Sequence, residues 1–401
     1  MKIKINKTKG STIVVFLIWS MLFSIPVLSQ RINNIILLSS ELIITIWFLR
    51  KHKGRNLTKK YCVPIILLWI CFILTTILNI GLDTRTLNAF VTGYKYVLFF
   101  YAIAFFVKYN KFESVLGEFY ILSLIILILS DVAVLISKGK GIGGNDVLGN
   151  FFIGNKFAVS YLHMLFLSLF QLHRGKKNKF KLFHYFILVA YSIIICYLME
   201  CSTGIVGCLV MGLYTFLDWK KTKLSRILES PKVFLAVFFG ATFLLVFSDV
   251  LLGNAYFTNL FMKYSHTSKI LSGRLDMYEI ALLHIQRSPW IGYGINCTIV
   301  EDILTWGNAQ NGLLKLLLDH GIIGTVAFSI VAYNAFYSKK ESDEYTHSKL
   351  APFIALLYGL AICSMVEICL VGHFYLALAV VNAFNHLEVG NAVFRKIIKK
   401  A

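Results

Sequence analysis

The segment YCVPIILLWICFILTTILNIG, residues 61–81, contains no charged side chain and is long enough to cross a bilayer as a helix. A hydrocarbon core of about 30 Å needs about 20 apolar residues in one helix. Similar runs recur along the chain, which has 401 residues and is 57% hydrophobic but only 15% charged. A soluble domain does not tolerate this composition. The sequence therefore predicts a single, all-α, polytopic integral membrane domain over residues 1–401.

About twelve membrane spans are predicted from these apolar runs, although about ten or eleven also fit the pattern. The spans are expected at residues 12–29, 35–49, 61–81, 88–107, 114–136, 152–172, 182–199, 203–217, 233–252, 321–337, 350–370 and 372–387. The first run follows several lysines, as a signal peptide does, but it is long and lacks a small-residue cleavage site. We interpret it as an uncleaved first span.

The net charge of +20 fits either nucleic-acid binding or membrane topology. Most of the 40 Lys and Arg residues fall in alternate connections between the spans, for example in the clusters at residues 51–60 and 176–181. By the positive-inside rule, this asymmetry places both termini in the cytoplasm. We therefore interpret the basic clusters as topology signals and expect no nucleic-acid partner.

The longest predicted external segment, residues 253–320, separates the ninth span from the tenth. Functional residues often lie in such loops, which a rigid frame positions. The segment contains GRLDMYEIALLHIQRSPWIGYG at residues 273–294. A helix is expected from Arg274 to Arg287, with Ser272 as its cap and Pro289 after its end.

Arg274 and Tyr278 share the face of this helix that is expected to pack on the membrane domain. A guanidinium beside the free N–H groups of a helix N-terminus is suited to binding phosphate. Alternatively, Arg274 is structural and contacts a carboxylate or lipid headgroups. Trp290 and Tyr293 follow in a loop rich in glycine, where they can stack on sugar rings or anchor at the membrane interface.

A second helical pattern, NAQNGLLKLLLD, covers residues 308–319. Its leucines form an apolar face, whereas Asn311, Lys315 and Asp319 recur every four residues on another side. This polar stripe is expected to lie along the outer surface or to line a cavity. Asn311 and Lys315 are therefore candidates for substrate binding.

Taken together, the two segments resemble the O-antigen polymerase and ligase superfamily, the Wzy-type and related enzymes. CSTGIVG at residues 201–207 is a weaker match, since many members carry Ser-Arg where Thr203 stands here. The resemblance implies a GT-C-like membrane fold with one large external loop between the ninth and tenth spans. It is carried by Gly273, Arg274, Tyr278, Ala281, Pro289, Gly292 and Gly294, and by Gln310, Asn311, Leu313, Leu316, Gly321 and Gly324.

The resemblance implies a polymerase that transfers a growing glycan from its polyprenyl-pyrophosphate carrier to a lipid-linked repeat unit. This reaction would serve capsule, O-antigen or exopolysaccharide synthesis outside the bacterial plasma (inner) membrane. The implied partners are the polyprenyl-pyrophosphate-linked oligosaccharide, the lipid bilayer, a flippase and a chain-length regulator. Ligases of the superfamily carry a histidine where this chain has Gln310, and glutamine is no base near neutral pH. A polymerase is therefore favoured over the two alternatives, a ligase-type glycan transferase and a lipid-linked oligosaccharide flippase or transporter.

In this interpretation, positioned cations stabilise the pyrophosphate leaving group, and neither a metal nor another cofactor is expected. The other candidate cations are Arg85, Lys156 and Lys95, and each has a structural alternative. These alternatives are interface anchoring for Arg85, snorkelling for Lys156 and pairing with Glu367 for Lys95. Glu367 is expected about one turn inside the outer end of span 350–370, where an ionisable group is a functional candidate. The predicted catalytic residues are Arg274, Glu367, Gln310 and His320, and the predicted substrate-binding residues are Arg85, Lys95, Lys156, Tyr278, Trp290, Tyr293, Asn311 and Lys315.

Overall fold

The computed structural model describes residues 9–23, 28, 30–51, 59–141, 150–176, 182–246, 274–304, 308–338 and 344–387. Within these ranges every regular element is a helix. The predicted cap Ser272 and most of the first half of the segment 253–320 lie outside the described residues. The described helices are α1 (Lys9–Ser20), α2 (Gln30–Lys51), α3 (Lys59–Ile80), α4 (Thr84–Lys108), α5 (Phe112–Ile136), α6 (Lys156–Lys176), α7 (Leu182–Leu198), α8 (Ser202–Trp219), α9 (Lys223–Leu228), α10 (Pro231–Val246), α13 (Arg274–Arg287), α14 (Ile299–Leu304), α15 (Gly312–Phe336), α16 (Glu344–Cys363) and α17 (Gly372–His386).

Several of these helices are long and apolar enough to cross a membrane, which agrees with a polytopic all-α protein. Two more, α7 and α10, are apolar but shorter. Each predicted span overlaps a described helix, but by length and composition fewer of these helices than expected qualify as spans. The number of spans and the side on which each connection lies remain predictions. In the described residues, the 7 candidate spans are Arg31–Arg50, Cys62–Ile80, Thr84–Lys108, Phe112–Ile136, Ser202–Trp219, Gly312–Phe336 and Tyr345–Cys363.

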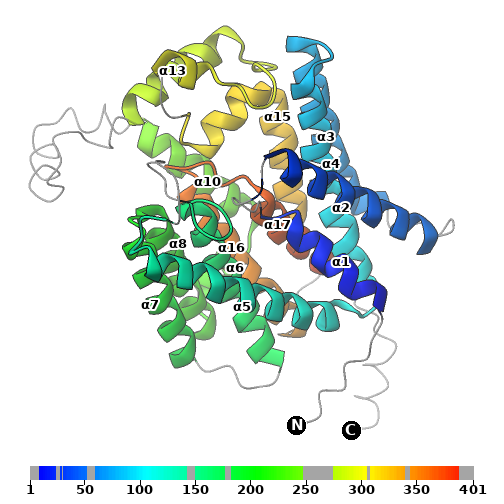
Figure 1. Cartoon of the computed structure of the whole chain (residues 1–401), viewed down its shortest axis with the longest axis vertical. Coiled ribbons are helices and arrows are strands. Elements are labelled where there is room, and N and C mark those ends of the chain that lie inside the picture. Colours follow the sequence, from blue (N-terminus) through cyan, green and yellow to red (C-terminus); the bar gives the residue numbers. More distant parts are fainter. Residues whose placement is uncertain are drawn as a thin grey trace, which may run out of the picture.

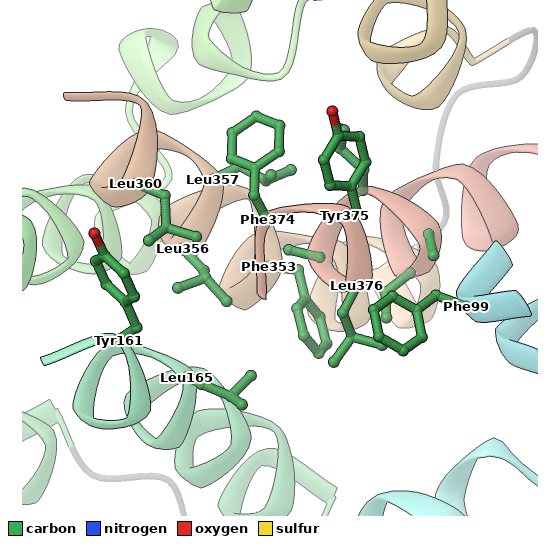
Figure 2. Packing of buried hydrophobic residues seen from close by; sticks show 14 of the residues in the cluster. Phe99, Tyr161, Leu165, Phe353, Leu356, Leu357, Leu360, Phe374, Tyr375 and Leu376 are labelled. Atoms are coloured by element: carbon green, nitrogen blue, oxygen red, sulfur yellow. The ribbon is translucent and has the colours of Figure 1, made fainter. Parts of the chain in front are cut away.

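The helix α17 forms the centre of the bundle. Every residue from Gly372 to Phe384 is buried, and the helix packs against α4, α15 and α16. Figure 2 shows Phe374 and Leu376 of α17 among side chains of α16, α4 and α6. In the same helix, the Tyr375 ring stacks on Tyr96 with centroids 3.8 Å apart. A helix that is apolar all round is stable only when it is enclosed in this way.

The peripheral helices expose apolar side chains instead. Leu42 of α2, Leu78 of α3 and Ile136 of α5 are 61%, 68% and 74% exposed. In water, apolar area of this extent would be unfavourable, at about 25 cal/mol for each Å². Contact with lipid removes that cost, so these faces are suited to the bilayer.

Two predicted boundaries are wrong in a way that matters for the site. The helix α16 ends at Cys363, and residues 364–371 form a non-helical connection to α17. Glu367 therefore lies between two helices rather than inside a span. In addition, α15 begins at Gly312, so it joins the second half of the predicted loop helix to the tenth span across a kink at Gly321. A smaller shift is that α6 begins at Lys156 instead of residue 152.

The helix α13 lies at one end of the bundle, against α15 (Figure 1). A small hydrophobic cluster forms this contact and includes Met277, Tyr278 and Ala281 of α13 with Leu314 and Leu318 of α15. The cluster is separate from the main core. It fixes α13 above the membrane helices and thereby positions the candidate site.

Candidate functional site

The helix α13 has the limits and the orientation expected from its sequence. It runs from Arg274 to Arg287. Met277 and Tyr278 are 0% and 1% exposed, whereas Asp276 and Glu279 are exposed. The apolar residues fall on one stripe of the helix, which packs on α15 because burial removes that stripe from water. Arg274, at the first position of the helix, is partly buried on the same side.

The loop after α13 is docked into the kink of α15. At the kink, the helix carbonyls of Leu318 and Asp319 accept hydrogen bonds from Tyr293 N (2.7 Å) and Gly294 N (2.8 Å). Gly321 has φ 60°, and a Cβ there would collide with the backbone of Trp290. Only glycine adopts this conformation without a steric cost. Gly292 and Gly294 of the first sequence block and Gly321 of the second thus belong to one tertiary contact.

Arg85, at the start of α4, holds the same loop from the other side. Its Nε donates to the carbonyl of Ile295 (2.9 Å), and its Nη2 donates to the carbonyls of Tyr293 (3.0 Å) and Gly294 (3.1 Å). Thr76 of α3 contributes through its hydroxyl, which accepts from Ile295 N (3.1 Å). The donors of Arg85 are thus directed to the backbone of the loop. Its role in substrate binding remains a prediction.

The polar stripe on α15 is largely buried, so it does not lie along the outer surface, and the alternative that it lines a cavity remains a prediction. Lys315 Nζ contacts Asp319 Oδ1 (2.9 Å) and donates to the carbonyl of Cys297 (2.8 Å). Asp319 Oδ1 also accepts from Cys297 N (3.0 Å). Charged groups are tolerated in such a site when they are paired and hydrogen-bonded. This pair fixes the end of the docked loop, and substrate binding by Lys315 remains a prediction.

Asn311 joins α15 to the connection between α16 and α17. Its Oδ1 caps α15 by accepting from Leu313 N and Leu314 N, both at 3.0 Å. Its Nδ2 donates to the carbonyl of Met365 (2.8 Å), and the Tyr278 hydroxyl donates to the same carbonyl (3.0 Å). Gly312 N donates to the carbonyl of Ser364 (2.8 Å). Residues 364–371 are therefore held by α13 and by the start of α15.

Asn311→Ala is expected to destabilise this end of the protein by about 1–2 kcal/mol, because it removes a helix cap and a buried hydrogen bond. The thermal unfolding midpoint of the purified protein in detergent would fall. Asn311→Ser is the matched variant, since a serine oxygen can cap α15 but cannot reach Met365. The unfolding midpoint of Asn311→Ser should lie between those of the wild type and Asn311→Ala. An unchanged midpoint in Asn311→Ala would show that Asn311 does not support the connection.

Glu367 lies in the connection 364–371, where the charges of two cations act on it. The residue is 9% exposed, and its Oε1 accepts from Ile368 N (3.1 Å). Burial raises the pKa of Glu367, and the positive charges of Arg274 and Lys156 lower it by a smaller amount. Burial likewise raises the pKa of Tyr278 to about 12, and the charges of Arg274 and Glu367 also act on it. Four predicted site residues from α13, α6 and the connection thus form one electrostatic cluster.

The Arg274 side chain has a buried donor that is not used within the described residues. Its Nε has no hydrogen-bond partner among them. An unsatisfied buried donor costs about 1–3 kcal/mol, and more when it is charged, so it needs an explanation. A guanidinium fork fits the oxygens of a phosphate group. The neighbouring Gln310 has φ 39°, and its carbonyl accepts from the Tyr278 hydroxyl (3.5 Å).

Lys156 lies at the cluster, whereas Lys95 does not. Lys156 Nζ donates to the carbonyl of Glu200 (3.3 Å) at the end of α7. The charge of Lys95, within α4, interacts instead with Glu41 of α2 and with His373 of α17. Lys95 and Glu367 are therefore not partners, since Arg274 and Lys156 are the cations acting on Glu367. The sequence-based site prediction did not include Glu41. It is the only acidic residue in predicted span 35–49, and an ionisable group inside a span is a signal that could have identified it.

The remaining predicted residues lie around the docked loop. His320 is a residue of α15, and its side chain packs against α3. Its ring stacks on Phe72 with centroids 4.2 Å apart, and its Nδ1 lies 2.7 Å from the Thr75 hydroxyl. The Trp290 side chain is 64% exposed. The Tyr293 hydroxyl donates to the carbonyl of His284 (3.0 Å). Their proposed roles in catalysis or sugar binding remain predictions.

Comparison with known families identifies part of the chain. A family model described as O-antigen ligase matches residues 187–329. The match begins in α7 and ends in α15, so it contains α13, the docked loop and Asn311. Lys156 and Glu367 lie outside it. No curated protein and no solved structure matches the chain.

Proposed function

We propose that this chain is a polysaccharide polymerase acting on polyprenyl-pyrophosphate-linked repeat units, and the match of residues 187–329 to a family model described as O-antigen ligase supports this. The coarser assignment, a membrane enzyme of glycosyl transfer, follows from the family. The polymerase activity, the pyrophosphate carrier and an extracytoplasmic site are our proposal.

The observation that carries the proposal is the Nε of Arg274, which has no partner among the described residues, together with the action of the Arg274 and Lys156 charges on Glu367. A glycosyl pyrophosphate leaves with negative charge that develops in the transition state. Donors that are already in place stabilise this charge without reorganisation, and such stabilisation is a large catalytic contribution. In the proposed reaction, Arg274 binds the departing pyrophosphate and Lys156 adds a second positive charge.

Glu367 is the proposed general base. The bond between the donor sugar and its pyrophosphate breaks, the acceptor hydroxyl oxygen bonds to the freed carbon, and the hydroxyl proton passes to the carboxylate. A carboxylate accepts a proton more readily when its pKa is raised, and burial acts in this direction on Glu367. The positive charges of Arg274 and Lys156 act in the opposite direction and lower the pKa of Glu367.

A carboxylate base also supports the choice of polymerase over ligase. The superfamily ligases carry a histidine at the position of Gln310, and this chain has no base there. Glu367 supplies a titratable group at the same cluster, since Tyr278 contacts the carbonyl of Gln310 and is acted on by the charge of Glu367. The reaction can therefore proceed without the ligase histidine.

The test uses purified protein in proteoliposomes with a lipid-linked repeat unit as the only substrate. A ladder of products that increases by one repeat unit supports the polymerase. Transfer that needs a second, chemically different acceptor would instead identify a ligase. Movement of the substrate across the membrane without any new glycosidic bond would identify a flippase.

Gln310→Ala is expected to retain most of the polymer, with a loss of less than about tenfold, because glutamine provides no base. Product length and yield are measured in the same proteoliposomes. Gln310→Glu is a useful companion because it introduces a carboxylate with the same backbone conformation. Complete loss of polymer in Gln310→Ala would show that this side chain contacts the reacting groups.

A further inference from the structure

A second cluster of ionisable side chains lies at the opposite end of α8 and α16 from Arg274. It contains Asp218 near the end of α8, Glu229 immediately after α9, and His347 in the first turn of α16. An 18-residue helix such as α8 is about 27 Å long, so this cluster is remote from the proposed reaction. It belongs to connections that the charge pattern places in the cytoplasm.

The two nitrogens of the His347 ring have different surroundings. Nε2 is hydrogen-bonded to Asp218 Oδ1 at 2.7 Å. Nδ1 lies 3.1 Å from Glu229 Oε1, yet that buried oxygen has no hydrogen-bond partner among the described residues. A carboxylate that accepts the Nε2 proton leaves the lone pair of Nδ1 available. This is the usual second-shell arrangement for a histidine that binds a metal through its other nitrogen.

An independent observation is the hydroxyl of Tyr214. The side chain is 3% exposed, and within the described part of the chain its hydroxyl makes no hydrogen bond. Tyr214 lies one turn before Asp218 on the same face of α8, and the charges of Asp218 and Glu229 both act on it. A buried tyrosine hydroxyl normally has a partner. The Tyr214 hydroxyl therefore lacks a partner among the described residues, and Glu229 Oε1 is held there by its 3.1 Å contact with His347 Nδ1.

We propose that this cluster binds a divalent transition-metal ion of the Zn²⁺ or Mn²⁺ type. His347 Nδ1 and the Glu229 carboxylate are the proposed ligands, and Asp218 orients the imidazole ring. Water fills the remaining positions, and one water is held by the Tyr214 hydroxyl. Imidazole and carboxylate groups suit these ions. The ligand atoms of Asp218, Glu229 and His347 all lie within 4.8 Å of one another.

A bound ion explains features that a simple ion pair does not. A protonated His347 between two carboxylates would satisfy both Asp218 and Glu229, but it would leave the Tyr214 hydroxyl without a partner among the described residues. The ion would join the ends of α8, α9 and α16, and α8 already packs closely on α16. Its role is therefore to stabilise this end of the bundle, and it does not depend on the proposed polymerase activity.

The full-length protein in detergent, without an affinity tag, is treated with a chelator and then titrated separately with Zn²⁺ and Mn²⁺. Mass spectrometry of the metal content gives the stoichiometry, and the unfolding midpoint reports stabilisation by the ion. About one equivalent of one of these ions is expected to bind to the site. His347→Asn should abolish this binding, and Glu229→Gln should weaken it at least about tenfold. Asp218→Asn should weaken it by about 10- to 100-fold, as second-shell changes do.

Glu301→Gln and His284→Asn, in the α13–α14 region, are the matched controls and should bind as the wild type does. Size-exclusion profiles without metal show whether each variant is folded. Among the cluster variants, Asp218→Asn is expected to perturb folding least. The proposal is overturned if the wild type takes up neither ion. It is equally overturned if an ion binds and the three cluster variants retain wild-type affinity.

Discussion

Arg274→Ala is expected to reduce polymer formation by about 10²- to 10³-fold while the protein remains folded in the membrane. Removing one preorganised donor from a site of developing negative charge has this effect in other enzymes, corresponding to about 2.7–4 kcal/mol. The loss should exceed that of a surface charge, because the guanidinium is partly buried and its Nε has no partner within the described residues. The measurement is the rate of ladder formation in proteoliposomes that contain equal amounts of each variant.

Two companion variants separate the charge from its geometry. Arg274→Lys keeps the positive charge but loses the planar fork, so its activity should be intermediate. Arg287→Ala removes an exposed arginine from the other end of the same helix and should leave activity near that of the wild type. Wild-type ladders from Arg274→Ala would remove this residue from the site. They would also remove the observation on which the proposed function depends.

Glu367→Gln is expected to slow polymerisation by about 10²-fold or more, because the amide cannot accept a proton from the acceptor hydroxyl. The substitution preserves the size of the side chain and its oxygen acceptor for Ile368 N. Glu279→Gln, on the exposed face of α13, is the matched control. Equal rates for Glu367→Gln and the wild type would exclude this carboxylate as the base.

The pH dependence of the reaction provides a second test of Glu367. The base acts in its deprotonated form, and burial raises the pKa of the carboxyl above its ordinary value of 4.5. Wild-type activity should therefore be low in acid and should rise as the pH increases through the raised pKa. The residual activity of Glu367→Gln should not show this step. A step that persists in the variant would have to come from another group.

Much of the candidate site was accessible from sequence because it depends on short-range patterns. The limits of α13 and the burial of Tyr278 follow from the spacing of apolar residues between Arg274 and Pro289. The loop rich in glycine after α13 could also be predicted, but the contacts that its glycines make could not. At the kink of α15, Gly294 N bonds to the carbonyl of Asp319 and Gly321 lies against the backbone of Trp290, and these contacts join segments that are distant in the chain.

Three basic residues show more clearly what the sequence could not predict. Arg85, Lys95 and Lys156 look alike in the sequence, since each is a basic residue near the predicted outer end of a span. In the folded chain, Arg85 binds loop carbonyls, the charge of Lys95 acts on Glu41, and only Lys156 acts on Glu367. Side-chain partners of this kind are set by which helices pack together, and no local pattern reports them.

The sequence by itself determined that the chain is helical and built for a membrane, and that α13 is amphipathic with Arg274 at its start. These properties depend on the length and period of apolar runs, which are local. Only the tertiary structure decided that Glu367 lies outside the helix, where the charge of Arg274 acts on it. The N–H groups of residues 364 and 365 still donate to α16, but their carbonyls accept hydrogen bonds from Gly312, Asn311 and Tyr278. The connection after α16 is therefore held by residues that are distant in the sequence.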